Sequence, residues 1–167
     1  MEKLFFSGES FIGIKLNAVA SSEGIRKIFI NKDFLQTDLT NLNEVTPEDP
    51  LMFNLFKQFD QYFKRERKEF NLPLDIIGTE FQKRVWAELE NIKYGETITY
   101  QQLATRLGDV KSIRAAGRAN GANPLPIVIP CHRVIGTNGK LVGYGGGLNV
   151  KRKLLEIEES LNPDLFA

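Results

Sequence analysis

Apolar and polar residues alternate along the first thirty positions, which is the pattern of strands in a half-buried sheet. The runs at 13–19 and 25–30 are β-rich, and the segment 21–24 between them has turn composition. This pattern predicts a small antiparallel meander over residues 3–30. A helix start follows at 46–50, and from residue 51 apolar side chains recur at helical spacing. We therefore expect a sheet followed by one amphipathic helix.

Residues 73–167 have a different pattern, dominated by short helical segments. Two capping boxes begin helices there: Thr79 with Gln82, and Thr99 with Gln102. Turn and cap residues at 108–109 separate the second of these helices from a third, expected at about 111–120. Two short helices joined by a tight turn that contains glycine favour a helix-turn-helix.

The remaining segments predict a short apolar strand, a turn, a flexible loop and a last helix. They lie at 127–129, 137–140, 143–147 and about 149–160. The whole pattern indicates an α/β (α+β) protein in two parts. Residues 1–72 form an N-terminal structural lobe with a small antiparallel sheet and a helix. Residues 73–167 form a mostly helical lobe with the helix-turn-helix and a short strand that leads to the candidate active site.

The third predicted helix has unusually small side chains beside two arginines. Arg114 and Arg118 lie one turn apart on a common face. Four small residues leave much of the surface bare: Ala115, Ala116, Gly117 and Ala119. Such a helix can approach a nucleic-acid groove closely, whereas the alternative is that the small residues permit tight helix packing.

Composition limits the classes of protein to which the chain can belong. It has 167 residues, of which 42% are hydrophobic and 26% charged, as in an ordinary globular protein. One cysteine and one histidine exclude an internal disulfide and the usual structural zinc sites, and no apolar run suits a signal peptide or membrane span. A cytoplasmic location is therefore expected.

Charge is unevenly divided between the two halves of the chain. Residues 1–78 carry ten Lys/Arg against twelve Asp/Glu, whereas residues 79–160 carry twelve against eight. The basic half also holds the cysteine, which gives modest support for an anionic partner.

The candidate chemistry lies in Pro130-Cys131-His132-Arg133-Val134, which holds both unique residues. A free thiol has a pKa of about 8.5, so a reactive cysteine needs a base nearby, and His132 is the sole candidate. In an extended chain the two side chains point to opposite sides, so a bend or a bridging water is required. A carboxylate that fixes the histidine tautomer would help, and Glu158 lies on the inward stripe of the last helix with Leu154 and Leu161. A lone buried cysteine is otherwise more often inert.

The run Ile129 to Val134 resembles the active-site signature of the O6-alkylguanine-DNA alkyltransferases. The resemblance continues from about Phe81 to Glu158, over roughly half of the chain, with the other motifs in order. They are Gly95-Glu96-Thr97-Ile98-Thr99-Tyr100-Gln101-Gln102-Leu103-Ala104, Arg114-Ala115-Ala116-Gly117, Asn123-Pro124 and Tyr144-Gly145-Gly146-Gly147.

The resemblance implies direct-reversal DNA repair. Cys131 takes the methyl or alkyl group from O6 of guanine, with O4 of thymine as a further candidate substrate, and the protein is spent. His132 activates the thiol through a water, Glu158 orients His132, Asn123 braces the loop and Tyr100 donates a proton to the departing base. Arg114 fills the stack that the flipped nucleotide leaves.

The resemblance also assigns binding residues and partners. The base pocket comprises Pro126, Val134, Tyr144, Gly145 and Gly146. The DNA-binding residues comprise Tyr100, Gln101, Arg114, Ala115, Arg118 and Thr137. The expected partner is double-stranded DNA with O6-alkylguanine, bound through the minor groove. The protein is expected to be a monomer without metal or organic cofactor, and its N-terminal lobe to be ribonuclease-H-like.

Two departures from the family pattern and three rival functions qualify this hypothesis. Gly145 stands where serine or alanine is frequent, and Asp109 stands where an asparagine can meet phosphate, so a helix cap is expected instead. A non-enzymatic binder of alkylated DNA is disfavoured by Cys131. A helix-turn-helix regulator would not need the Cys-His pair, and a Cys-His hydrolase would need an oxyanion-hole motif that is not evident.

Overall fold

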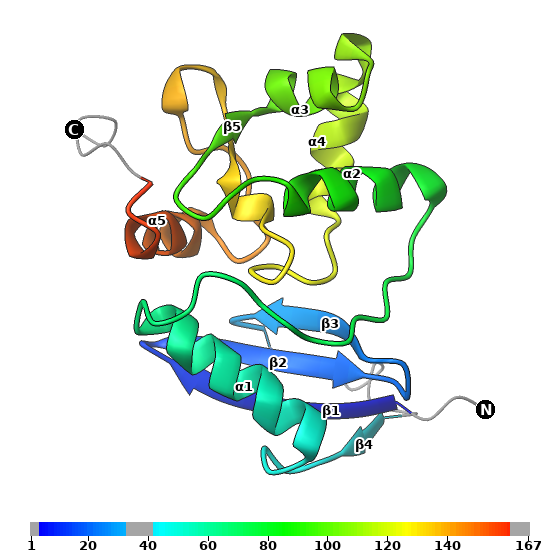
Figure 1. The fold of residues 1–167 in the computed structure, drawn as a ribbon, viewed down its shortest axis with the longest axis vertical. Coiled ribbons are helices and arrows are strands. Elements are labelled where there is room, and N and C mark those ends of the chain that lie inside the picture. The colour runs from blue at the N-terminus through cyan, green and yellow to red at the C-terminus, as the bar shows by residue number, and fades with distance from the viewer. Residues whose placement is uncertain (1–3, 33–41, 161–167) are drawn as a thin grey trace. The chain divides into compact units, whose positions relative to one another are not determined.

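The computed structural model describes residues 4–32 and 42–160. The chain folds as two compact units, residues 1–77 and residues 78–167 (Figure 1). Within the described residues, no helix is both long and apolar enough to cross a membrane.

The first unit contains a four-stranded sheet. Its strands are β1 (Leu4–Phe11), β2 (Ile14–Ala20), β3 (Ile25–Ile30) and β4 (Leu42–Glu44), in the order β3-β2-β1-β4. The first three strands pair antiparallel, which confirms the predicted meander. The expectation of a wholly antiparallel sheet is wrong at β4, which pairs with β1 in parallel. Strands β2 and β3 separate β1 from β4 along the chain. A connection of this length allows β4 to run in the same direction as β1.

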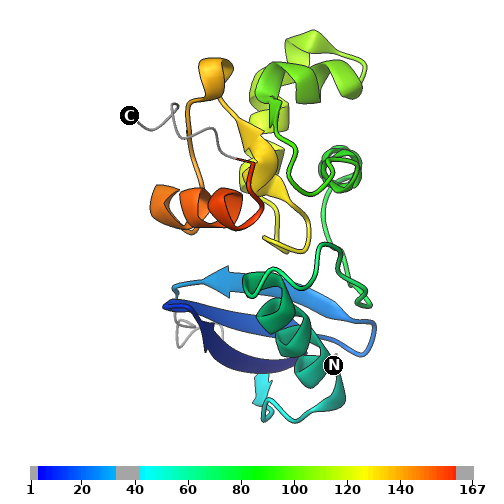
Figure 2. The ribbon, with the colours of Figure 1, turned by 60° about the vertical axis from the view of Figure 1, so that its left-hand side comes forward.

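Helix α1 (Pro50–Phe63) lies across one face of this sheet, as Figure 2 shows. The Asp49 side chain caps it by accepting hydrogen bonds from the backbone N–H groups of the helix start. An aromatic cluster forms the contact between helix and sheet, because the ring of Phe11 on β1 packs against three rings of the helix. These are Phe56, Phe59 and Phe63, with centroid separations of 5.5–6.2 Å.

The second unit consists mainly of short helices. Its helices are α2 (Glu80–Glu90), α3 (Tyr100–Arg106), α4 (Ile113–Gly121) and α5 (Leu148–Ile157). Up to residue 160, where the described part of this unit ends, three 3₁₀ turns accompany them: η1 (Val110–Ser112), η2 (Cys131–Arg133) and η3 (Thr137–Gly139). Two short strands, β5 (Ile98–Thr99) and β6 (Val134–Ile135), pair in parallel.

The helix starts and the helix-turn-helix follow the local sequence signals. Both predicted capping boxes are present, with Thr79 and Thr99 as the N-caps of α2 and α3. Asp109 caps η1, as expected, and the chain then continues directly into α4. The indole of Trp86 on α2 donates to the carbonyl of Ala119 at 2.8 Å and so joins α2 to α4. Ala116 and Ala119 are buried, so these two small residues serve helix packing rather than an exposed surface.

The predicted strand at 127–129 is wrong. The segment is a tight turn in which the Ile129 N–H donates to the carbonyl of Leu125, and Ile127 has a positive φ of 75°. The predicted turn at 137–140 is present, but it is the 3₁₀ turn η3 with Asn138 at φ 64°. No strand follows it to complete a hairpin within the described part of the chain.

Candidate active site

The Cys-His pair lies on a 3₁₀ turn instead of an extended strand. Pro130 precedes η2, and the Arg133 N–H closes the turn on the carbonyl of Pro130 at 3.1 Å. A 3₁₀ helix has about three residues per turn, so successive side chains diverge by about 120° rather than pointing to opposite sides. The turn therefore supplies the bend that a reaction between Cys131 and His132 requires.

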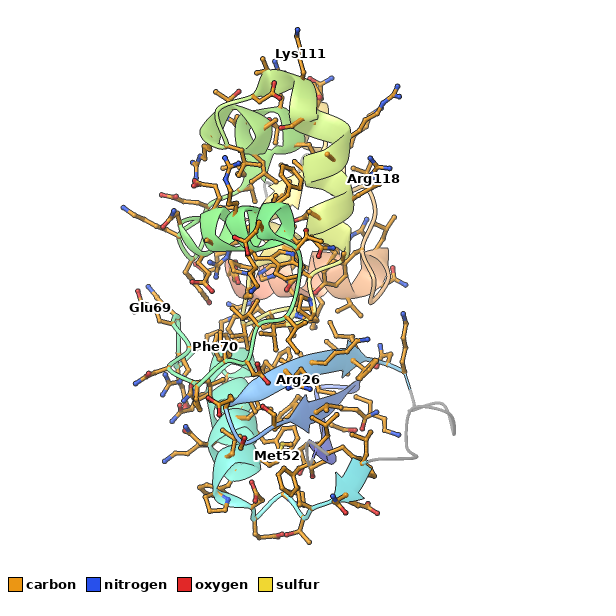
Figure 3. The ribbon with its side chains drawn as sticks, turned by 90° about the vertical axis from the view of Figure 1, so that its right-hand side faces the viewer. Arg26, Met52, Glu69, Phe70, Lys111 and Arg118 are labelled. Carbon is orange, nitrogen blue, oxygen red and sulfur yellow. The ribbon has the colours of Figure 1, made fainter. Side chains whose placement is uncertain are left out.

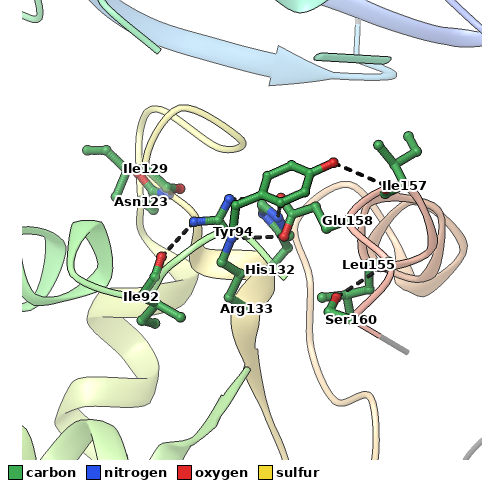
Figure 4. A network of polar contacts seen from close by, with 10 residues as sticks. All are labelled: Ile92, Tyr94, Asn123, Ile129, His132, Arg133, Leu155, Ile157, Glu158 and Ser160. Carbon is green, nitrogen blue, oxygen red and sulfur yellow. Dashed lines mark hydrogen bonds and ion pairs between the residues drawn. The ribbon is translucent and has the colours of Figure 1, made fainter. Parts of the chain in front are cut away.

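A buried ion-pair network lies behind this turn (Figure 4). Nε2 of His132 is 2.7 Å from Oε1 of Glu158, the C-cap residue of α5. The Arg133 guanidinium donates to both carboxylate oxygens, at 2.9 Å and 3.0 Å, and to the carbonyl of Ile92 at 2.6 Å. His132 and Glu158 are at most 2% exposed, so this network is screened from solvent.

The network fixes the protonation states of its members. Burial alone would raise the pKa of Glu158, but contacts with His132 and Arg133 outweigh it and lower that pKa to about 2. Burial, together with nearby positive charges such as that of Arg133, lowers the pKa of His132 by more than the contact with Glu158 raises it. The carboxylate can only accept, so a neutral His132 donates through Nε2 and carries its lone pair on Nδ1. Nδ1 is buried without a partner in the described residues, and it is the ring nitrogen that can accept a proton.

Cys131 is a buried thiol whose proton must be removed. Burial raises its pKa, while a hydrogen bond from Asn123 and the positive charge of Lys151 act in the opposite direction. The thiol form therefore dominates at neutral pH, and the nearby base has to generate the thiolate.

Asn123 braces the loop that leads to this turn. Its Nδ2 donates to the carbonyl of Ile129 at 2.7 Å, and its Oδ1 accepts from the backbone N–H of Leu125 at 3.0 Å. One side chain thus replaces the strand pairing that segment 127–129 lacks, and it holds Cys131 at the end of a fixed loop.

Lys151 on α5 holds a second loop, residues 142–147, beside the site. Its buried Nζ donates to the carbonyls of Val134, Val142 and Gly143 at 2.7, 3.2 and 3.4 Å. Burial lowers its pKa to about 8, against the effect of Cys131, so the ammonium form prevails at neutral pH. The hydroxyl of Tyr100 donates to the same Val142 carbonyl at 3.2 Å.

Comparisons of the chain with protein-family models and with individual proteins agree with one another. Residues 80–160 match the DNA binding domain of 6-O-methylguanine DNA methyltransferase, and residues 18–76 match its ribonuclease-like domain. The methylated-DNA–protein-cysteine methyltransferase of Mycobacterium tuberculosis is 50% identical over 118 residues, 71% of this chain and 72% of the relative. The chain belongs to this methyltransferase family.

Two further comparisons extend the match. The constitutive methylated-DNA–protein-cysteine methyltransferase of Bacillus subtilis is 43% identical over 136 residues, 80% of this chain and 82% of the relative. The crystal structure of the Mycobacterium tuberculosis protein in complex with DNA superimposes with a TM-score of 0.83 at 38% identity, over 93% of each chain. The expected α/β fold class and the resemblance stated from the sequence are confirmed.

The structure brings together most of the side chains that the methyltransferase motifs single out. Cys131, His132 and Glu158 are buried and Asn123 is half-buried, while Leu161 of the predicted stripe lies outside the described residues. In the predicted base pocket, Val134 is fully buried and the hydroxyl of Tyr144 is buried without a partner among the described residues. Pro126 and Gly146 are half-buried and Gly145 is exposed.

The predicted DNA-binding residues are accessible side chains of the second unit. Arg114, Gly117 and Arg118 line an open depression of about 560 Å³ on α4. Figure 3 shows Arg118 and Lys111 projecting away from the body of the unit. Gln101 and Thr137 are exposed, while Ala115 and Tyr100 are half-buried.

Sequence reasoning missed two buried polar residues of the methyltransferase site, Arg133 and Lys151, and a third that lies near it, Asn120. Lys151 could have been found, because it shares the i, i+3, i+4, i+7 stripe with Leu154, Leu155 and Glu158. Asn120 shares a stripe with the buried Ala116 and Ala119 in the same way. For Arg133 the only signal is its position in the motif, because its partners are 25 and 41 residues away.

Proposed function

We propose that this chain repairs O6-alkylguanine in double-stranded DNA by moving the alkyl group to Cys131, once per molecule. The observation that carries the proposal is a buried thiol beside a histidine whose Nε2 is held by Glu158. This arrangement leaves Nδ1 as the base. Family membership supports the same reaction class.

The proposed reaction is an in-line displacement on carbon. The Cys131 thiol gives its proton through one water to Nδ1 of His132, and the resulting imidazolium is stabilised by Glu158. The S–C bond forms while the bond between carbon and O6 breaks, and guanine leaves with a proton from Tyr100. The S–C bond of the resulting thioether is stable, because breaking it would require the Cys131 thiolate to leave from an unactivated alkyl carbon, so the protein is not regenerated.

In-line attack of Cys131 on the alkyl carbon requires that the target nucleotide lie outside the base stack. In this proposal α4 enters the minor groove, Arg114 fills the vacated stack and Tyr100 helps to rotate the nucleotide out. The base then enters the pocket of Val134, Pro126 and the loop from Tyr144 to Gly146, where a backbone N–H contacts it. The proposal includes a monomer in the cytoplasm and a supporting role for the first unit.

The direct test is the intact mass of the protein after incubation with duplex DNA that carries O6-methylguanine. We expect the protein to gain one methyl group in place of the thiol proton, and peptide mapping to locate it on Cys131. Cys131→Ala should show no gain under the same conditions. Unchanged mass with retained binding would instead identify a non-enzymatic binder of alkylated DNA, and release of an acid or peptide from another substrate would identify a hydrolase.

Arg114→Ala is expected to slow repair in duplex DNA by about tenfold or more, because extrusion of a nucleotide costs a few kcal/mol that the arginine would offset. Reaction with the free base O6-methylguanine should change by less than about twofold, because that base needs no extrusion. Stopped reactions followed by mass spectrometry measure both rate constants. Arg152→Ala, which removes an exposed arginine of α5, is the matched control. Equal losses with both substrates would show that Arg114 does not assist extrusion.

A further inference from the structure

Asn120 is a buried polar residue with no part in the reaction described above. It lies in the last turn of α4 and is 5% exposed. Its Nδ2 donates to the carbonyl of Cys131 at 3.4 Å, at the long end of the hydrogen-bond range. Its Oδ1 is buried and has no partner within the part of the chain that the structure describes. An unpartnered buried amide oxygen lowers stability, so this side chain suits a role other than packing.

The phenol of Tyr100 lies beside this amide. Its ring packs on α4 at Gly117, where an added Cβ would come within 3.6 Å of the ring. Asn120 follows Gly117 by three residues and so lies one turn further along the same side of the helix. Burial, and secondarily Cys131, raise the pKa of Tyr100, whereas a hydrogen bond with the Asn120 side chain lowers it.

These contacts give the Tyr100 oxygen two distinct neighbours. Its O–H donates to the carbonyl of Val142 at 3.2 Å. The stabilisation of the ionised phenol by Asn120 requires the amide N–H to be the donor and the phenol oxygen the acceptor. When a guanine enters the pocket, only the Tyr100 O–H then has to turn from the Val142 carbonyl to the guanine. The Asn120 amide keeps the phenol oxygen of Tyr100 in place.

We propose that Asn120 is a positioning residue that holds the Tyr100 oxygen beside the nucleophile and stabilises the phenolate formed when Tyr100 protonates the departing base. The inference rests on the proposed function, because it needs Tyr100 as the proton donor. During transfer the S–C bond forms, the bond between carbon and O6 breaks and the guanine takes the Tyr100 proton. The negative charge left on the phenol oxygen accepts a hydrogen bond from Nδ2 of Asn120, and such charge-assisted bonds are stronger than neutral ones.

The test uses two Asn120 variants of the full chain and two methyl donors. Asn120→Leu removes the amide at similar volume, and Asn120→Asp keeps the shape but is an acceptor only when ionised. Both should slow methyl transfer from O6-methylguanine in duplex DNA by about tenfold or more, the effect of losing a hydrogen bond to a charged group. The rate at which iodomethane methylates Cys131 should change by less than about twofold in both variants. Iodide needs no proton when it leaves, so Asn120 and this reaction should be independent, and independent effects add within that margin.

A double-mutant cycle separates this role from a merely structural one. In the Tyr100→Phe background, either Asn120 substitution should slow repair by less than about twofold, because the two residues act as one unit. An equal loss with iodomethane, or a full tenfold loss in the Tyr100→Phe background, would overturn the inference. Thermal unfolding shows whether each variant is folded, and if Asn120→Leu is not, the cycle with Asn120→Asp decides. Failure of the unsubstituted protein to take a methyl group from DNA would instead refute the proposed function itself.

Discussion

Glu158→Ala is expected to lower the free energy of unfolding by about 3–5 kcal/mol, because it leaves the Arg133 guanidinium buried without its counter-ion. It should also slow alkyl transfer by roughly a hundredfold or more, the size of a general-base contribution. The tautomer that places the lone pair on Nδ1 of His132 depends on this carboxylate, so the base is lost with its orienting partner. Chemical denaturation measures the first effect, and the rate of methylation of Cys131 measures the second.

One further variant at position 158 separates the effect of charge from that of shape, and a variant at a neighbouring position serves as the control. Glu158→Gln keeps the shape but not the charge, so it should also destabilise the fold. Glu156→Ala removes an exposed carboxylate of the same helix and should change stability by less than about 0.5 kcal/mol. If Glu158→Ala and Glu156→Ala had equal effects, the buried network would not stabilise the fold in the way described.

The pH dependence of this effect follows from the lowered pKa of Glu158. The pKa is about 2 in the folded protein, against an ordinary value of 4.5 for a glutamate, so the unfolded chain binds more protons between these values. The stability that Glu158 contributes is fully present above pH 4.5 and is lost as the pH falls towards 2. The difference between the unsubstituted protein and Glu158→Gln should therefore narrow over that interval.

Features that depend on neighbouring residues could be predicted from the sequence. Thr79 and Thr99 cap their helices because a hydroxyl and a glutamine three residues later satisfy the first N–H groups of a helix wherever it lies. Strand β3 at 25–30 and the inward position of Glu158 follow from periodicity in the same way. The Cys131-His132 pair could be predicted as the candidate site because each of the two residues occurs only once in the chain.

Features that depend on distant partners could not be predicted. The apolar run 127–129 has the composition of a strand, yet Asn123 satisfies its backbone through a side chain and leaves it as a turn. From the sequence, Arg133 would be expected to be a surface charge. Only the fold places it in contact with Glu158 and with the carbonyl of Ile92. In each case a polar contact between segments overrides the local preference, and this occurs where the candidate site is built.

Lys151→Met is expected to lower the free energy of unfolding by about 2–4 kcal/mol, because three buried or partly buried carbonyls lose their shared donor. The loop 142–147 should then separate from β6, so repair should slow as the wall of the base pocket is lost. Burial lowers the pKa of Lys151 to about 8, from the ordinary lysine value of 10.5, so the unfolded chain binds more protons between those values. The stability advantage of the unsubstituted protein over Lys151→Met should therefore widen across that interval.

Lys153→Met is the matched control, because it removes the same charge from an exposed position of α5. It should leave the unfolding free energy within about 0.5 kcal/mol of the unsubstituted value. Hydrogen exchange of the amides at 142–147 provides a local readout, which should rise in Lys151→Met well before global unfolding. Unchanged exchange in this loop would mean that the Tyr100 contact with Val142 is sufficient to hold it, and that Lys151 stabilises only the buried end of β6.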